Sequence, residues 1–447
     1  MTAGHASYAE DFRTVQATLP GAGVPWLQQL RTNAMGAFLD SGFPTTRTED
    51  WKYTDLRSLT RRHYRPAARP QPANCAVPAD PWWQDELQHR LVFIDGYFVP
   101  ELCPPGPLLS GVTLTGLARV LEEQPDLLEH RLGRNTDLEQ PGFNAFNTLF
   151  MRDGAYISLG DGAVLDQPVH LLFVSTGTDA SLRPVRNIIV AGPDSHATVI
   201  ESYVALNDAA GLTSAVTEIS LETGAHIEHY KLEEESASAS HIAGIYVTQD
   251  RDSRFDSHNI ALGGQLVRND LQVALNGPGA ATTLNGLTVT RGRQHVDNHT
   301  RVDHNEPQAR SDEWYRGILD DRSRAVFNGR IVVHPDAQQT VSHQHNHNLL
   351  LSGDAEADAK PQLEIHADDV QCTHGCTVGQ LDEEALFYFR SRGVDATTAR
   401  NFLVYAFAAD VLERIRIRPV RRMLERRLAG RFMETEALDF LRDRLSG

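Results

Sequence analysis

The sequence predicts a mainly β fold, a β-helix of stacked coils, flanked by an N-terminal and a C-terminal helical region. Between residues 154 and 366, alternating apolar residues and Gly- or Asp-rich turns recur with almost no helical pattern between them. The turn glycines Gly160, Gly192 and Gly224 follow one another at intervals of 32 residues (192 − 160 and 224 − 192). A repeat of about thirty residues in β units is typical of stacked coils, whereas a β-sandwich is the alternative that the pattern leaves open.

Six segments of this region share one shape, in which apolar alternation leads into a turn, a small residue and further alternation. They are residues 155–165, 187–200, 217–230, 271–284, 315–327 and 348–363.

The predicted N-terminal helical region covers residues 1–90 and ends in a Pro-rich linker. Phe12, Val15 and Leu19 recur at helix spacing, and five prolines between residues 64 and 82 indicate an extended or linking segment. Residues 91–99 predict a hairpin around Asp95-Gly96, where the β-helix core of residues 91–366 begins. A helical pattern at residues 115–132 interrupts this core.

The predicted C-terminal helical region covers residues 367–447. Asp382 is a candidate N-cap for a helix that Gly393 ends, and Asp395 is a candidate N-cap for a second, more apolar helix. The tail, residues 421–447, is highly charged and predicts a solvated helical hairpin.

Composition excludes several classes of function. A formal net charge of −17 opposes binding to nucleic acid or to anionic membranes. The chain starts with neither a basic nor an apolar run and contains no apolar stretch long enough to span a membrane, so we expect a cytoplasmic protein. Its four cysteines are too few to staple 447 residues, which agrees with a reducing compartment. Phosphate-loop, zinc-helix, nucleophile-elbow and dinucleotide motifs are missing, so we expect a partner to hydrolyse any ATP that the protein's task requires.

Cys372 and His374 form the first candidate site. If this stretch is extended, alternate residues face one side, so His366, Asp368, Cys372 and His374 are predicted to share a face. Thiolate and imidazole suit iron, zinc or a cluster, and two ligands leave positions for a partner chain. Spacing alone also fits a cysteine that acts as a small buried apolar residue. Cys376 adds a second thiol four residues further on.

His343, His345 and His347 form the second candidate site, because alternation places all three on one strand face. They support an alternative function, a metal-dependent enzyme on a β-helix or cupin-like scaffold, although strand histidines also face solvent or a polar ladder. A polysaccharide-active β-helix is a weaker alternative, since paired carboxylates do not stand out. A looser group is predicted in a loop: His295, His299 and His304.

Three stretches resemble signatures of the SufB/SufD family of iron–sulfur cluster assembly scaffolds. They are residues 47–56 (RTEDWKYTDL), 361–379 (PQLEIHADDVQCTHGCTVG) and 382–393 (DEEALFYFRSRG), and the likeness covers essentially the whole chain. The sequence is more similar to the SufD branch, because Gly375 stands where SufB-like chains typically carry Glu. The resemblance implies a right-handed parallel β-helix with helical ends.

The resemblance also implies a complex of SufB-, SufC- and SufD-like subunits, in which the SufC-like ABC ATPase hydrolyses ATP. Cys372 and His374 take the positions of the family's SufB/SufD interface site, with His374 the stronger candidate, so iron or a nascent cluster would be shared transiently with the SufB-like subunit. Cys376 stands where Ala is expected. Unpaired coil edges also favour a homodimer of the isolated chain. The predicted ATPase-docking residues are Asp382, Phe387, Tyr388, Arg390, Gly393 and Tyr405.

Overall fold

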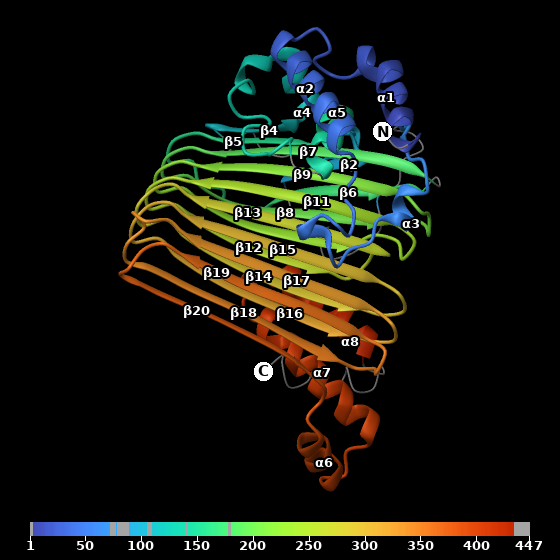
Figure 1. The fold of residues 1–447 in the computed structure, drawn as a ribbon, viewed down its shortest axis with the longest axis vertical. Helices are drawn as coiled ribbons and strands as arrows, with labels where there is room; N and C mark the ends of the chain where they lie inside the picture. Colours follow the sequence, from blue (N-terminus) through green and yellow to red (C-terminus); the bar gives the residue numbers. More distant parts are fainter. Residues whose placement is uncertain are drawn as a thin grey trace.

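The central body of the protein is a parallel β-solenoid whose strands alternate along the chain between two ten-stranded sheets (Figure 1). The computed structural model describes residues 3–71, 77, 89–104, 110–139, 142–177 and 180–432. Sheet A contains β1 (Arg65–Pro66), β4 (Val112–Gly116), β5 (Ala155–Leu159), β7 (Ser181–Ala191), β9 (Leu212–Leu221), β11 (Ser240–Gln249), β13 (Leu266–Leu275), β15 (His295–His304), β17 (Arg324–Val333) and β19 (Glu356–Ile365). Sheet B contains β2 (His89–Ile94), β3 (Tyr97–Phe98), β6 (Val169–Ser175), β8 (His196–Ala205), β10 (His226–Glu234), β12 (Arg254–Ala261), β14 (Ala281–Thr290), β16 (Arg310–Leu319), β18 (Thr340–Leu350) and β20 (Val370–Gly379).

The repeat predicted from the sequence is one turn of this solenoid. His196 pairs with His226, 30 residues on (226 − 196), and Arg324 pairs with Glu356, 32 residues on (356 − 324). The six segments predicted as strand, turn and strand are therefore corners at which the chain passes from one sheet to the other. The predicted β-helix is confirmed. The sandwich alternative is wrong, because consecutive strands of the solenoid alternate between the two sheets and the chain joins the sheets once in every coil.

The corners before the sheet B strands share a left-handed residue. A Cβ on Gly224 would lie 2.2 Å from Oδ1 of Asp194 in the preceding coil, so the tight stacking of corners favours glycine at this position. The equivalent residues have φ between 55° and 76°: Asp194, Gly224, Asp252, Gly279, Gln308 and Gln339.

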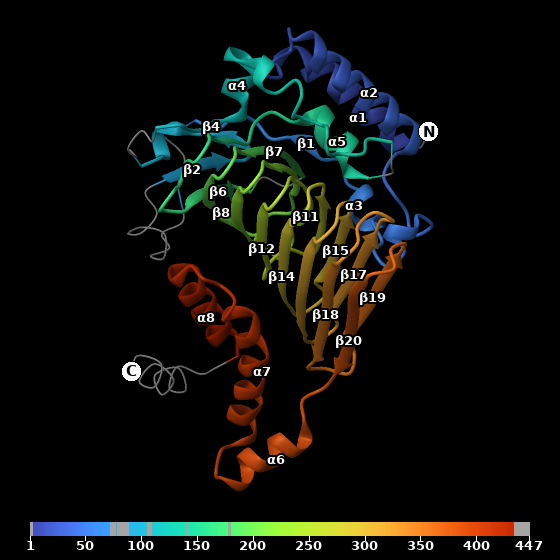
Figure 2. The same cartoon turned by 90° about the vertical axis from the view of Figure 1, so that its left-hand side faces the viewer.

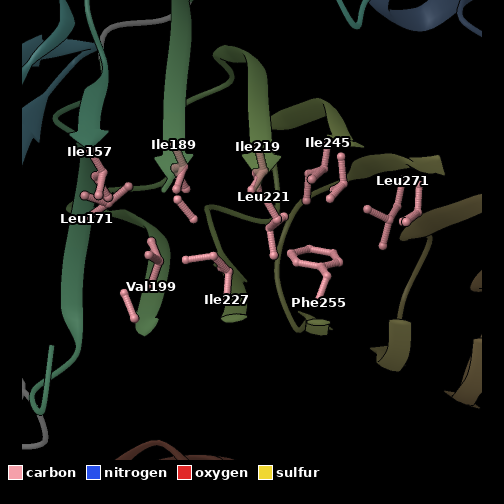
Figure 3. Packing of buried hydrophobic residues seen from close by; sticks show 14 of the residues in the cluster. Ile157, Leu171, Ile189, Val199, Ile219, Leu221, Ile227, Ile245, Phe255 and Leu271 are labelled. Carbon is pink, nitrogen blue, oxygen red and sulfur yellow. The ribbon is translucent and has the colours of Figure 1, made fainter. Parts of the chain in front are cut away.

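The apolar core fills the interior of the early coils (Figure 3). Side chains at matching positions of successive strands stack in columns, which satisfies the backbone in the sheets and buries apolar surface between them. In sheet A, Ile157, Ile189 and Ile219 form one such column, and Ile245 and Leu271 belong to another. In sheet B, Ile227 is paired with Phe255.

The N-terminal helices cover the outer face of the early sheet A strands (Figure 1). Tyr8, Phe38, Phe146 and Phe150 form an aromatic cluster there, with Tyr8 and Phe146 ring centroids 5.0 Å apart. The predicted hairpin is confirmed, since β2 and β3 pair antiparallel across Asp95. The helices of this half are α1 (Ala3–Val15), α2 (Pro25–Ser41), α3 (Arg57–Thr60), α4 (Leu117–Glu123) and α5 (Phe143–Phe150), with short 3₁₀ helices at Gln16–Thr18, Glu49–Trp51, Pro100–Leu102 and Pro125–Leu127. Of the linker predicted between residues 64 and 82, residues 72–76 and 78–82 lie outside the described residues.

The C-terminal helices are α6 (Glu383–Ser391), α7 (Ala396–Leu412) and α8 (Arg418–Phe432), and the last two pack on the outer face of sheet B (Figure 2). The predicted N-caps are confirmed, because Asp382 accepts from the backbone N of Glu384 and Asp395 from that of Thr397. The predicted solvated tail is wrong for α8. Its apolar residues Val420, Met423, Leu424 and Leu428 are buried. Residues 433–447 lie outside the described part.

Candidate metal-ligand site at the open end of the solenoid

β20, the last strand of the described residues, forms one edge of sheet B, and its one partner strand there is β18. Its residues Cys372, His374 and Cys376 pair with Ser342, Gln344 and Asn346, which are buried in the solenoid interior. Because paired residues in neighbouring strands point to the same face, the three donors point to the interior side of the last coil. No further coil covers them, so Cys372 is half-buried and the other two are exposed.

His366 and Asp368 do not join this row. β19 ends at Ile365 and β20 begins at Val370, so both residues lie in the corner between the sheets. The bend of the corner interrupts the alternation on which the prediction relied. β structure therefore continues to Gly379, beyond the boundary at residue 366 from which a helical region was predicted.

Polar side chains line the interior behind the donors. Cys372 and Ser342 continue a column in which the hydroxyl of Ser342 lies 2.7 Å from that of Ser311. His374 continues the column of Gln344 and Glu313, in which the Gln344 amide donates to the Glu313 carboxyl at 3.2 Å. The interior behind the donors is therefore polar, which suits groups that exchange with water or a ligand.

Sequence reasoning missed Ser342, Gln344 and Asn346 as the layer that supports the donors. The sequence contains a pattern that could have revealed this layer, because residues 342–348 are polar at every position. A strand that lines an apolar core has one apolar face. A strand that is polar on both faces therefore indicates that the interior of the solenoid is polar at this point.

In the described part of the chain, no charged side chain lowers the pKa of the Cys372 or Cys376 thiol. Burial raises the pKa of both Cys372 and Cys376 above the ordinary thiol value. Both are therefore thiols at neutral pH, and a metal ion must displace their protons before they act as ligands. Within the described residues, no three His, Cys, Asp or Glu side chains of one chain are placed to hold a metal ion.

The second candidate set, His343, His345 and His347, lies on the opposite face of sheet B from the first. Nδ1 of His343 is 2.8 Å from the Thr373 hydroxyl, and Nδ1 of His347 is 2.6 Å from the Thr377 hydroxyl. These contacts tie β18 to β20 and engage one nitrogen of each ring. They describe a polar ladder on the outer face of the sheet.

His345 links this ladder to the C-terminal helices. Its ring stacks on Trp314 with centroids 4.3 Å apart, and the Arg414 guanidinium lies 4.1 Å from the Trp314 ring centroid. Arg316 bonds Asp410 of α7 at 2.7 Å. The histidine-rich strand therefore packs against the segment that carries α7 and α8.

The looser histidine group is not in a loop. His295, His299 and His304 lie on β15, where His295 and His299 face outward and His304 is buried in the interior. His299 pairs with Asp297 at 3.0 Å, and Thr54 bonds both His295 and Asp297. The stretch 47–56 thus crosses sheet A and joins the N-terminal region to later coils. Lys360 of β19 bonds Glu49 within it at 2.6 Å.

The predicted docking residues lie mainly on α6, which buries none of its own residues. Phe387 is 72% exposed and Tyr388 58% exposed. Gly393 ends the helix region with a φ of 88°. Tyr405 differs from these residues, because it is half-buried on α7 and burial raises its pKa.

The buried side chain of Glu313 makes the free energy of unfolding depend on pH. Burial raises its pKa from 4.5 to about 7, and its donors within the described residues are Thr300 and Gln344. Between pH 4.5 and 7 the unfolded chain loses this proton while the folded chain keeps it, so the free energy of unfolding falls as pH rises. We expect Glu313→Gln to stabilise the protein by about 2–3 kcal/mol at pH 8 and by little at pH 4, as measured by urea unfolding at both values. An equal effect at both pH values would contradict a neutral buried carboxyl.

The fold and these residues define a class of protein, a parallel β-solenoid whose open end presents thiol and imidazole donors in an incomplete set. The family model of the SufBD core domain of the SUF system for FeS cluster assembly matches residues 173–407, and the model of the SufBD N-terminal region matches residues 2–171. This chain belongs to the SufBD family of iron–sulfur cluster assembly proteins.

Curated relatives agree with this assignment. The chain is 32% identical over 410 residues to an iron–sulfur cluster assembly SufBD family protein of Synechocystis, covering 90% of each chain. It is 32% identical over 401 residues to iron–sulfur cluster assembly protein SufD of Escherichia coli, covering 88% of this chain and 90% of that one. It is 24% identical over 408 residues to SufD of Bacillus subtilis, covering 89% and 92%. In the described part of the chain, the helices are too short or too polar to cross a membrane.

Proposed function

We propose that this chain is the SufD-like, non-enzymatic subunit of a cytoplasmic scaffold for iron–sulfur cluster assembly. It pairs with a SufB-like subunit through the free edge of β20 and binds a SufC-like ATPase through α6. Iron or a nascent cluster is held transiently by Cys372 and His374 together with the SufB-like subunit. The observation that carries the proposal is the row of donors on an unpaired strand edge at the open end of the solenoid.

The geometry favours a shared site for two reasons. A free edge presents unpaired backbone N–H and C=O groups, which bind another strand and bring its side chains beside the donors. Thiolate and imidazole are ligands for iron and for iron–sulfur clusters, and two of them leave coordination positions open. A ligand set completed by a second chain holds its metal only while the chains are paired, as transient assembly requires.

Reconstitution with SufB- and SufC-like subunits tests the site. We expect His374→Ala and Cys372→Ala to leave the complex assembled but to lower its iron and acid-labile sulfide content by about tenfold or more, because each removes a ligand. His343→Ala is the matched control, since it removes a histidine from the opposite face of the same sheet and should retain the cluster. Unchanged iron and sulfide in both site variants would sink the assignment.

A further inference from the structure

A cavity of about 270 Å³ lies on the outer face of sheet A, on the other sheet from the donor row of β20. Its floor consists mainly of outward-facing residues of β11, β13, β15, β17 and β19, and two segments of the N-terminal half cover it. These segments are residues 48–51 and 142–144, and the first belongs to the blue stretch that crosses sheet A in Figure 1. Binding sites for small molecules are typically such preformed hollows.

Buried contacts fix the walls of this cavity. The Arg268 guanidinium lies 3.8 Å from the centroid of the Trp51 ring, and Nη1 of the same arginine donates to the backbone O of Asp50 at 2.6 Å. Elsewhere in the wall, the Tyr246 hydroxyl accepts from the Asn144 amide at 2.6 Å and donates to its oxygen at 2.9 Å. Trp51 and Tyr246 are 4% and 5% exposed. A ligand that enters a preformed cavity loses little affinity to reorganisation.

The floor of the cavity follows one column of paired residues. Gly244, Asp270, His299 and Asn328 are successive partners in β11, β13, β15 and β17. A Cβ on Gly244 would lie 2.7 Å from Cε2 of Tyr246, so a larger residue here would displace the ring that forms part of the wall. The glycine therefore keeps the first position of this column open.

Asn328 presents an unused amide to the cavity. It lines the cavity with 7% of its surface exposed, and within the described residues its side chain has no hydrogen-bond partner. Buried polar side chains are almost always hydrogen-bonded, because an amide that loses its hydration without gaining a partner is destabilising. The amide offers an acceptor oxygen and two N–H donors to a molecule in the cavity. This side chain is the observation that points to a ligand.

Two guanidinium groups lie side by side in the lining. Arg301 and Arg330 are direct partners in the pairing of β15 with β17, and each side chain is 41% exposed. Arg301 donates through Nε and Nη2 to Asp303, and Arg330 donates through Nη2 to Glu364. In the described part of the chain, Nη1 of both arginines and Nε of Arg330 have no hydrogen-bond partner. Neighbouring guanidinium N–H groups suit a carboxylate.

Carboxylates line the cavity in the same number as guanidinium groups. The charged lining residues are Asp50, Asp137 and Asp270 together with Arg268, Arg301 and Arg330. Asp270 pairs with His299, so Arg301 lies one strand across and two residues along, about 8 Å away between Cα atoms. The carboxylates repel a simple anion and the guanidinium groups repel a simple cation. The lining therefore matches a small molecule that carries both charges.

We propose that this cavity binds a free α-amino acid in its zwitterionic form. Arg301 and Arg330 bind the carboxylate of the ligand, Asn328 donates to the same group, and Asp270 accepts from the ammonium group. The ligand contacts both the covering segments and the strands beneath them, so it stabilises the attachment of the N-terminal region to the later coils. The site uses no residue of the donor row and so goes beyond the proposed function.

The test uses the full chain, with the standard L-amino acids as probes one at a time, in thermal unfolding and isothermal titration. We expect at least one of them to bind with one molecule per chain and to raise the unfolding temperature, because a ligand that binds only the folded state stabilises it. The amine that lacks the carboxylate and the acid that lacks the amino group should each bind at least about tenfold more weakly, since each loses a charge-assisted hydrogen bond.

Two variants connect the binding to this cavity. Arg330→Met and Asn328→Leu should each weaken it by at least about tenfold, because each removes donors to the carboxylate. Asn328→Leu breaks no side-chain hydrogen bond of the described chain, so without ligand it should unfold at no lower a temperature than the unsubstituted chain. A purely structural role of Asn328 would lower that temperature. Arg322→Met is the matched control, because this arginine is 66% exposed, pairs with Asp354 and lies outside the cavity.

Three outcomes would overturn the inference: no amino acid binds, neither Arg330→Met nor Asn328→Leu weakens the binding, or a dicarboxylate (succinate) or a diamine (putrescine) binds as tightly as the best amino acid. Its failure is separable from failure of the proposed function. Asn328→Leu should still support cluster formation in the reconstituted heteromer, whereas His374→Ala should lose the cluster and keep amino-acid binding.

Discussion

Replacing Phe387 and Tyr388 together by alanine is expected to weaken binding of the SufC-like ATPase by about a thousandfold. Both rings project from α6, with 72% and 58% of their surface exposed, and α6 buries no residue in the described chain. Large aromatic side chains at the centre of an interface each contribute about 2 kcal/mol or more. Two such losses amount to about 4 kcal/mol, and every 1.4 kcal/mol is tenfold in Kd.

Isothermal titration of the purified ATPase against each variant measures this effect. Val164→Ala combined with Leu127→Ala is the matched control, since these residues are 57% and 46% exposed and lie in the early, N-terminal half of the chain. The control should bind as tightly as the unsubstituted chain, and both variants should unfold at the same temperature as it does. Wild-type affinity in the α6 variant would place the ATPase elsewhere.

The solenoid could be predicted because its corners recur, but glycine marks only some of them. Gly224 and Gly279 hold the left-handed position in two coils, while Asp194 and Asp252 hold it in others. Aspartate tolerates this conformation better than most residues, because its short side chain bonds locally. A repeat that is defined by backbone conformation is therefore only partly visible as a repeat of residue types.

The end of the solenoid could not be placed from the sequence for a related reason. Among the described residues β20 has no coil below it, and its interior face carries Cys372, His374 and Cys376 where β18 carries Ser342, Gln344 and Asn346. The burial of α8 was not predicted because arginines dominate its composition. Its apolar residues nonetheless recur at helix spacing from Val420 to Leu428, and this stripe packs on sheet B.

The donor row was predictable, whereas its relation to the second histidine set was not. Alternation alone puts Cys372 and His374 on one face. Which face His345 shares depends on the pairing of Gln344 with His374, residues 30 apart (374 − 344) in different coils. The lengths of the corners in the folded chain decide which residues of neighbouring coils are paired. This register cannot be read from a single sequence.

Arg186→Met is expected to destabilise the fold by about 3–5 kcal/mol, the largest effect on stability that we foresee. Arg186 and Glu218 are 0% and 2% exposed, and Nη2 of the arginine lies 2.5 Å from Oε1 of the carboxylate. Arg186 also donates to Asn147 of α5, and Glu218 accepts from the backbone N of Gly133. The pair thus joins sheet A to the N-terminal helical layer, and removing the arginine leaves a buried carboxylate without a compensating charge.

A second substitution separates loss of charge balance from loss of packing. Arg186→Met combined with Glu218→Gln removes the stranded charge and keeps an acceptor for Gly133, so it should recover most of the lost stability in urea unfolding. Arg119→Ala breaks the exposed pair with Glu123 and should change stability by less than about 0.5 kcal/mol. If the double variant is no more stable than Arg186→Met, packing and not the buried charge holds the helical layer to the solenoid.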